Sequence, residues 1–504
     1  MLFNSSAFIF AFLPAALLGF FVLARLGSEP ALAWLTAASL FFYGWWNPVW
    51  VPLLLVSIAF NFLVGQALAR KVSGIGDRPA GLSPRWLLAI AVSANLCLLV
   101  YYKYAAFVVD NVAALFGSNL RLEPTELPLG ISFFTFTQIA FLVDVYQRKA
   151  ADFSPVRYSL FVTYYPHLIA GPILHHKEMM PQFALAEILR FSANRVADGT
   201  CVFILGLFKK TVLADQFGSY ASVGFAAAAS QPLSLFESWG AALSYTMQIY
   251  FDFSGYSDMA IGLALMIGVQ LPLNFHSPYK ALSIVEFWRR WHMTLSRFLR
   301  DYLYIPLGGN RKGSLRRYLN LMLTMLLGGL WHGAGWTFAV WGMLHGAMLV
   351  VNTAWSHVTA PLSRYVPAPL RLPLKALSWG LTFLAVVVGW VFFRAPDIDT
   401  ALNMLVSMTG RHGAYLPSQL VSIAPWLDHI SQPIVSVPFL ADGTVMGFVE
   451  MLILLALGFF LVLATPSMHE LRPWQRYALV VPCAALALQR VLYGTSSQFL
   501  YFQF

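Results

Sequence analysis

The stretch GGLWHGAGW, residues 328–336, places one histidine, His332, in one of the most apolar parts of the chain. Glycines lie on both sides of it, and glycine allows close backbone approach and lets a helix break. Irregular backbone at membrane depth survives only when it is buried in protein or lines a wet cavity. An ionisable residue there is a functional-site candidate, because imidazole can accept a hydroxyl proton near neutral pH. The structural alternative is a neutral core histidine among glycines that serve tight helix packing.

A second histidine, His292, lies in the arginine-rich stretch EFWRRWHMTLSRFLRDYLYIPLGGNRKG, residues 286–313. At helical spacing its tryptophans, leucines and phenylalanine form an apolar face, while arginines cover much of the remainder. One interpretation is an interfacial amphipathic helix beside a positive-inside loop. The other is a basic cytoplasmic mouth for an anionic substrate such as a phosphorylated nucleotide thioester. The candidate substrate contacts here and beside His332 are Arg289, Arg290, Trp291, Arg300, Asn310, Arg311 and Trp331.

Two carboxylates, Asp252 and Asp258, lie in the stretch QIYFDFSGYSDMAIG, residues 248–262. Because they are six residues apart, one helix would point them to different faces, which argues against a local acid–base pair or metal pair. They are predicted either to bond to arginine or helix ends, or to belong to a proton or ion pathway, and both are kept as candidate substrate contacts. No metal site is expected, because His175, His176 and Glu178 lack further ligands at suitable spacing.

Composition places these residues in a membrane protein. Of 504 residues, 59% are hydrophobic and 11% charged, whereas soluble proteins carry about 25% charged residues. Repeated apolar runs of about 20 residues predict an all-α polytopic membrane protein with about 11 to 13 transmembrane or re-entrant helices. The runs lie near residues 7–25, 31–46, 50–69, 86–103, 129–146, 158–170, 199–214, 236–268, 318–332, 335–354, 375–393, 446–465 and 477–493.

Charge distribution predicts the orientation of the chain. No basic residue precedes the first apolar run, which argues against a cleaved signal peptide. The positive-inside rule puts the N-terminus outside and Arg25 in the cytoplasm. The net charge of +10 is concentrated in short loops, so topology and anionic membrane lipid explain it and no nucleic-acid partner is expected. The arginine-rich connection 276–317 should face the cytoplasm, and the acidic connection 395–445, with Asp428 and Asp442, should face outward.

Several long motifs resemble the membrane-bound O-acyltransferase family, and specifically its bacterial alginate O-acetylation branch. The resemblance rests on residues 286–313, on NLMLTMLLGGLWHGAGWTFAVWGMLHG at 320–346, and on three shorter stretches. These are PLGISFFTF (128–136), YYPHLIAGPILHHKE (164–178) and YFDFSGYSDMAIG (250–262). The likeness extends from the first apolar run to about residue 395.

The resemblance implies a ring of tilted helices around a funnel-shaped catalytic chamber, with His332 at the family's catalytic histidine and His292 at its second motif position. It implies one membrane domain, comprising N-terminal helices (1–125), a motif core (126–395), and an outer loop with C-terminal helices (396–504). The protein would be a multi-pass O-acetyltransferase of the cell inner membrane. It would have no bound cofactor and would take acetyl from acetyl-coenzyme A or an acyl-carrier thioester on the cytoplasmic side.

The acceptor implied by the resemblance is an exopolysaccharide of the alginate or cellulose type, reached from outside. The partners would be an extracytoplasmic transferase of the SGNH type or a related one, and a polysaccharide synthase or export complex. The glycines around His332 would make room for donor and acceptor to meet at its ring, which would act as a general base or through a covalent acyl-imidazole. The alternatives are transfer to another cell-envelope polymer, a proton-coupled transporter that uses Asp252, Asp258 and His332, and a non-catalytic scaffold. The absence of an internal repeat weakens the transporter hypothesis.

Overall fold

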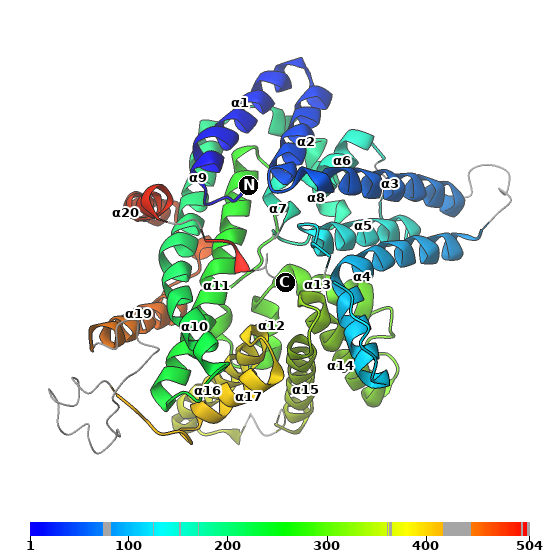
Figure 1. Ribbon diagram of the computed structural model, residues 1–504. Coiled ribbons are helices and arrows are strands. Elements are labelled where there is room, and N and C mark those ends of the chain that lie inside the picture. Colours follow the sequence, from blue (N-terminus) through cyan, green and yellow to red (C-terminus); the bar gives the residue numbers. More distant parts are fainter. Residues whose placement is uncertain are drawn as a thin grey trace. The chain divides into compact units, whose positions relative to one another are not determined.

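The computed structural model describes residues 1–73, 82–123, 125–150, 153–169, 171–359, 361, 365–416, 445–494 and 497–500. These residues fold into helices joined by turns and short irregular segments (Figure 1). Six helices in this part of the chain are long and apolar enough to cross a membrane: Phe8–Leu26, Pro48–Ser73, Pro84–Phe116, Trp336–Thr359, Ala368–Arg394 and Met446–Ala464. Each overlaps a predicted apolar run, so the all-α polytopic membrane class is confirmed. The remaining runs form shorter or more polar helices.

The chain divides into two compact units. Unit 1 comprises Met1–Leu207, Tyr256–Leu273 and Pro473–Phe504, and unit 2 comprises Phe208–Gly255 and Asn274–Arg472. Helix α11 (Leu235–Met266) contributes residues to both. The two candidate histidines, His292 and His332, belong to unit 2.

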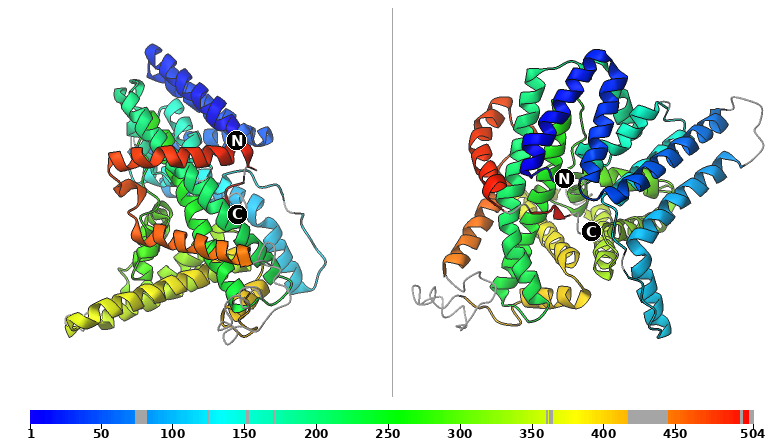
Figure 2. Two further views of the ribbon diagram at one scale, coloured as in Figure 1. Left: turned by 90° about the vertical axis from the view of Figure 1, so that its left-hand side faces the viewer. Right: turned by 45° about the horizontal axis from the view of Figure 1, so that its top comes forward.

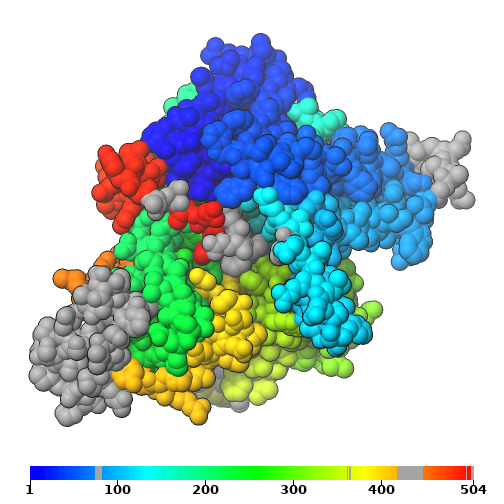
Figure 3. Space-filling view, in the orientation of Figure 1, coloured from blue at the N-terminus to red at the C-terminus, as the bar shows by residue number. Residues whose placement is uncertain are grey.

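Unit 1 is built on pairs of neighbouring helices. Helix α1 (Leu13–Leu23) packs against α2 (Ser28–Gly44), and α3 (Val51–Ser73) runs beside α4 (Pro84–Phe116), as two views show (Figures 1 and 2). The first three helices form a continuous surface, drawn in blue in Figure 3. These three helices carry exposed apolar side chains such as Leu18, Phe41 and Leu63. Such an apolar exterior is what a helix needs to face lipid. The other helices of the unit are α5 (Ile131–Tyr146), α6 (Pro155–Thr163), α7 (Tyr165–Leu168), α8 (His176–Phe183), α9 (Ala193–Phe208) and α20 (Pro473–Tyr493).

Unit 2 holds the candidate site between several helices that pack on one another. Helix α14 (Gly313–His332) packs along α15 (Trp336–Thr359), and α15 contacts α12 (Ile284–Arg290), α16 (Ala368–Arg394) and α17 (Ile398–Met408). The unit also contains the π-helix η5 (Lys209–Ala214), α10 (Asp215–Ala228), α13 (Met293–Leu299) and α19 (Val445–Ala464). The acidic connection after residue 395 begins with α17, whose N-terminus is capped by Asp397. Its Asp428 and Asp442 lie outside the described residues.

The glycines near His332 allow α14 and α15 to approach closely. A Cβ on Gly329 would lie 2.4 Å from the carbonyl oxygen of Phe338, and one on Gly342 would lie 2.4 Å from that of Met325. The Phe338 ring likewise fills the space beside Gly333. The predicted helix break occurs where α14 ends at His332. At Gly329 and Gly333 backbone and aromatic atoms already occupy the space, so these two glycines serve close packing, whereas a Cβ on Gly335 would meet only ordinary contacts from 3.6 Å.

Candidate functional site

The segment that carries His292 is two short helices with a sharp break between them. Helix α12 begins after Ser283, whose hydroxyl accepts the amide hydrogen of Glu286, and it ends at Arg290. Trp291 is extended, and His292 has a positive φ of 42°, a left-handed conformation that is unfavourable for a residue with a Cβ. Helix α13 starts at Met293. The interpretation of this stretch as one continuous amphipathic helix is therefore wrong, and the physical reason lies in its contacts with a neighbouring segment.

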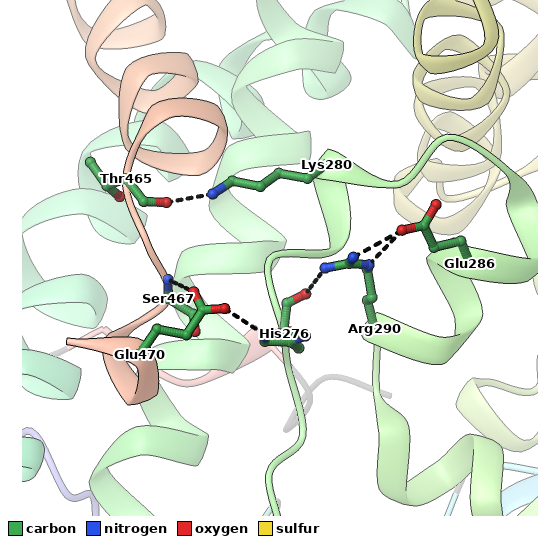
Figure 4. Close-up of polar contacts among 7 residues, drawn as sticks. All are labelled: His276, Lys280, Glu286, Arg290, Thr465, Ser467 and Glu470. Carbon is green, nitrogen blue, oxygen red and sulfur yellow. Dashed lines mark hydrogen bonds and ion pairs between the residues drawn. The ribbon is translucent and has the colours of Figure 1, made fainter. Parts of the chain in front are cut away.

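That neighbouring segment, residues 274–276, runs beside the break and pairs with it through backbone hydrogen bonds. The His276 amide donates to the Arg290 carbonyl at 3.0 Å, and the Met293 amide donates to the Asn274 carbonyl at 2.9 Å. The Arg290 guanidinium also donates to the His276 carbonyl at 3.2 Å and to Glu286 at 3.0 Å. These bonds outside the helix replace the intrahelical ones that the break gives up. Arg290, a predicted substrate contact, is thus occupied in holding the backbone (Figure 4).

A carboxylate from the end of unit 2 completes this support. Glu470 Oε2 accepts the Ser467 amide hydrogen at 2.7 Å, and its Oε1 lies 2.8 Å from His276 Nε2 (Figure 4). The Ser467 amide, followed by the His276 side chain, lowers the pKa of the Glu470 carboxyl to about 2, because both stabilise its ionised form. Lys280 Nζ donates to the Thr465 carbonyl at 2.6 Å and ties the same two segments together.

The structure brings His292 and His332 together although they are forty residues apart in the chain. Their ring centroids are 6.5 Å apart, and both side chains are buried. The two imidazoles are therefore neighbours within one buried cluster. Trp331, a predicted contact, packs against His332 at 4.9 Å and against His292 at 6.3 Å between centroids. Trp291 is also buried, 4.8 Å from the ring of Trp390.

A third buried histidine, His345, lies in the same aromatic cluster and was missed in the sequence. Trp341 connects it to His332, with ring-centroid distances of 4.8 Å to His345 and 5.2 Å to His332. Trp288 Nε1 donates to His345 Nδ1 at 3.3 Å, so the ring is held in one orientation. The rule that flagged His332, an ionisable residue inside an apolar run, applies equally to His345 and would have found it.

A cavity of about 600 Å³ opens beside this cluster, and three arginines line it. Its walls come from α12, α13, the π-helix Arg300–Tyr304, α14 and α15. The lining residues are Val285, Trp288, Arg289, Met293, Ser296, Arg297, Leu299, Arg300, Tyr304, Leu321, Thr324, Met325 and Leu349. Arg289 and Arg300 of the predicted basic contacts therefore meet at one cavity, with Arg300 also paired to Asp301 at 2.8 Å. Asn310 and Arg311 are exposed in a turn before α14 and do not line it.

The two aspartates of the 248–262 stretch lie in different units. In unit 2, Asp252 forms an ion pair with Lys210 at 2.6 Å, and Lys210 also pairs with Asp215 at 2.9 Å. Asp252 and Lys210 are both buried, so the pair neutralises a carboxylate that would otherwise be uncompensated. The structural interpretation predicted arginine or a helix end as the partner, and Asp252 pairs with a lysine instead. Asp258 is buried within unit 1.

The pair His175 and His176 lies at the start of α8, where both rings are buried. The His176 ring packs between Phe141 at 5.0 Å and Phe161 at 5.5 Å, which is the environment of a core side chain. Within the described ranges, no group of three or more His, Cys, Asp or Glu side chains is placed to hold a metal ion.

Comparison with known proteins identifies the class to which this arrangement belongs. The model of the membrane-bound O-acyltransferase family matches residues 86–387. A peptidoglycan O-acetyltransferase of Helicobacter pylori is 39% identical over 100% of this chain and 98% of its own length. A probable alginate O-acetylase of Azotobacter vinelandii is 42% identical over 81% of this chain and 78% of its own. A teichoic acid D-alanyltransferase of Streptococcus thermophilus is 28% identical over 53% of this chain and 68% of its own length.

The protein is therefore a multi-pass membrane enzyme that transfers acyl groups, and the two predicted histidines are buried neighbours in its unit 2. It belongs to the membrane-bound O-acyltransferase family, and it is an O-acetyltransferase of cell-envelope polysaccharide. The predicted family is confirmed. The narrower expectation of an alginate-type acceptor is not established, since a relative named for peptidoglycan matches the whole chain.

Proposed function

We propose that this protein takes acetyl from a cytoplasmic thioester and passes it across the membrane for O-acetylation of peptidoglycan. The observation that carries the proposal is the meeting of His292 and His332, 6.5 Å apart between centroids, beside an arginine-lined cavity. The donor is acetyl-coenzyme A or an acetylated carrier protein, both of which bring phosphate groups to the site.

The cavity supports a thioester donor through its charge and its position. Arg289, Arg297 and Arg300 provide positive charge for phosphate, while Leu299, Met325 and their neighbours provide apolar walls for a pantetheine arm. Two lining residues, Trp288 and Met293, lie close to His292 in the chain, and Met293 follows it directly. We therefore propose that a thioester whose phosphates bind these arginines directs its acyl end toward the histidines.

The proposed transfer of acetyl from the thioester to a hydroxyl needs no bound cofactor. The acceptor oxygen forms a bond to the thioester carbonyl carbon, the carbon–sulfur bond breaks, and the thiol leaves. His332 accepts the hydroxyl proton and returns it to the departing sulfur, which is general-base and then general-acid catalysis. The aromatic walls formed by Trp331, Trp341 and Phe393 exclude water, so hydrolysis of the thioester is suppressed.

Peptidoglycan is the acceptor that sequence coverage favours. The relative named a peptidoglycan O-acetyltransferase aligns with the entire chain, whereas the probable alginate O-acetylase aligns with 81% of it. An exopolysaccharide of the alginate type is the second candidate, because identity over that shared part is 42%. In either case the protein acts with a separate extracytoplasmic transferase of the SGNH type, and the acetyl group alone crosses the membrane.

The acceptor is tested by measuring ester-linked acetate in isolated cell walls and in secreted polysaccharide from the same cells. In the His332→Ala strain, acetate on the cell wall should fall to background while the protein remains inserted at its normal level. His357→Ala is the matched control, since His357 lies far along α15 and contacts Arg317. Full wall acetylation in His332→Ala cells would refute the catalytic assignment, and loss of acetate from secreted polysaccharide alone would move the acceptor to the alginate class.

The direction of transfer is tested with sealed vesicles of known orientation that contain the partner transferase. Labelled acetyl-coenzyme A should support acceptor labelling when it is supplied to the cytoplasmic face. Labelling that requires donor on the outer face would overturn the direction. A transporter, in contrast, would move substrate without release of free thiol.

A further inference from the structure

We infer that Asn274 is a positioning residue that fixes the protonation pattern of His292, with the hydrogen on Nδ1 and the lone pair on Nε2. This inference rests on the acetyl transfer proposed above, and it adds a residue that no motif in the sequence singles out. Asn274 lies in the irregular segment beside the break between α12 and α13.

The hydrogen bonds around the Asn274 side chain identify which of its atoms faces His292. The backbone amide of Thr294 points at Asn274 Oδ1 at 3.4 Å, and the Thr294 hydroxyl lies 3.0 Å from the same atom. A backbone N–H can only donate, so the atom that receives it must be the amide oxygen and not the amide nitrogen. The orientation of the Asn274 amide is therefore determined by its neighbours.

The tautomer of His292 follows from this assignment. His292 Nδ1 lies 3.0 Å from the same Asn274 oxygen, which has no hydrogen to give. A ring nitrogen at that distance from an acceptor carries the proton, so neutral His292 is protonated on Nδ1. The lone pair on Nε2 can then accept a hydrogen bond from a substrate group while His332 removes the hydroxyl proton, and a neutral amide orients the ring without the charge that a carboxylate would bring.

The backbone holds this pair together as firmly as the side chains do. The Met293 amide donates to the Asn274 carbonyl, so the residue after His292 is bonded to the residue that orients its ring. The left-handed conformation of His292 is the geometry that turns its ring toward Asn274. Strained backbone of this kind persists where the surroundings determine it, and it is concentrated at functional sites.

The ring of His292 packs among other aromatic rings. They include Phe253 at 4.7 Å, Trp331 at 6.3 Å and His332 at 6.5 Å between centroids. Both His292 and Asn274 are buried, with exposed fractions of 0% and 1%, so solvent does not compete for the bond.

The first test reads the tautomer directly and does not depend on activity. The protein is labelled with ¹⁵N-histidine, and the His292 signals are assigned from their loss in His292→Asn. The wild type should show a protonated Nδ1 and an unprotonated Nε2, and Asn274→Leu should lose that pattern. A wild-type ring protonated on Nε2 would overturn the inference even if acetyl transfer is intact.

The second test measures acetyl transfer against pH in protein that elutes as a single species. Asn274→Leu should lower kcat at least tenfold with little change in KM for acetyl-coenzyme A. Asn274→Asp should shift the acidic limb of the pH–rate profile to higher pH, because a carboxylate raises the pKa of a histidine that must be neutral to act. If the acidic limb of Asn274→Asp matches that of the wild type, the positioning role is refuted.

Two comparisons separate this role from a structural one. Asn320→Asp changes another buried amide of unit 2, which donates to the carbonyls of Leu307 and Gly309, and it should leave the acidic limb in place. The double variant Asn274→Leu/His292→Ala should be no slower than His292→Ala alone, since Asn274 acts through His292. Additive losses in the double variant would contradict the inference. A wild-type protein that turns over no acetyl-coenzyme A would instead refute the proposed function, with the NMR result still deciding the tautomer.

Discussion

Replacing Gly342 by alanine is expected to separate α14 from α15 and thereby displace His332. The new Cβ would lie 2.4 Å from the Met325 carbonyl oxygen, whereas ordinary contacts begin at 3.4 Å. The helices must therefore separate by about 1 Å at this point (3.4 − 2.4). The three atoms nearest to the new Cβ all belong to the backbone of Met325 and Leu326, so no side-chain rotation can relieve the clash.

The expected loss of stability follows from two opposing effects. Overpacking of this kind costs about 1–3 kcal/mol, while alanine in place of glycine within a helix gains about 0.5–1 kcal/mol. The net decrease in the free energy of unfolding is about 1–2 kcal/mol. Because α14 ends at His332, a displacement of about 1 Å also misplaces its ring, and such errors lower rates by about 10²-fold.

Gly380→Ala provides the matched control for this experiment. Gly380 also lies inside a helix of unit 2, α16, but a Cβ there would meet nothing within 4 Å. This control should keep full activity and unfold at the wild-type temperature or above it. The assays are thermal unfolding in detergent, followed by tryptophan fluorescence, and acetyl transfer at saturating donor. If Gly342→Ala were as stable and as active as Gly380→Ala, the argument from close helix packing would be refuted.

Three further predictions concern charged groups. Asp252→Asn should lower the free energy of unfolding by about 2 kcal/mol, because buried Lys210 loses one of its two carboxylate partners and keeps Asp215; unchanged unfolding would contradict this. Glu470→Gln should lower the melting temperature at pH 7. Because the Ser467 amide depresses the pKa of Glu470 in the folded state, the difference in melting temperature from wild type should shrink as pH falls from about 4.5 to about 2. A difference in melting temperature that does not change with pH would refute this linkage. Arg289→Gln should raise KM for acetyl-coenzyme A more at low salt than at high salt, with kcat nearly unchanged, whereas Arg316→Gln, outside the cavity lining, should leave KM unchanged.

The sequence alone determined the class of the protein and singled out both histidines of its candidate site. Partition into a membrane depends on local composition, so apolar runs could be located without knowledge of any contact. Within the part of the chain that the structure describes, six of them are helices of spanning length. His332 was identified because an ionisable group among apolar residues and glycines is unusual in itself. The same rule, an ionisable residue inside an apolar run, applies to His345, so this histidine could also have been identified from the sequence.

Only the tertiary structure decided which groups meet. Helical periodicity predicted an unbroken helix through His292, but hydrogen bonds from residues 274–276 stabilise a break that local preferences disfavour. The partnership of Asp252 with Lys210 and the contact of His292 with Asn274 join residues that no spacing rule connects. Buried polar groups must find partners wherever the fold brings donors and acceptors together, and this is a property of the packed chain as a whole.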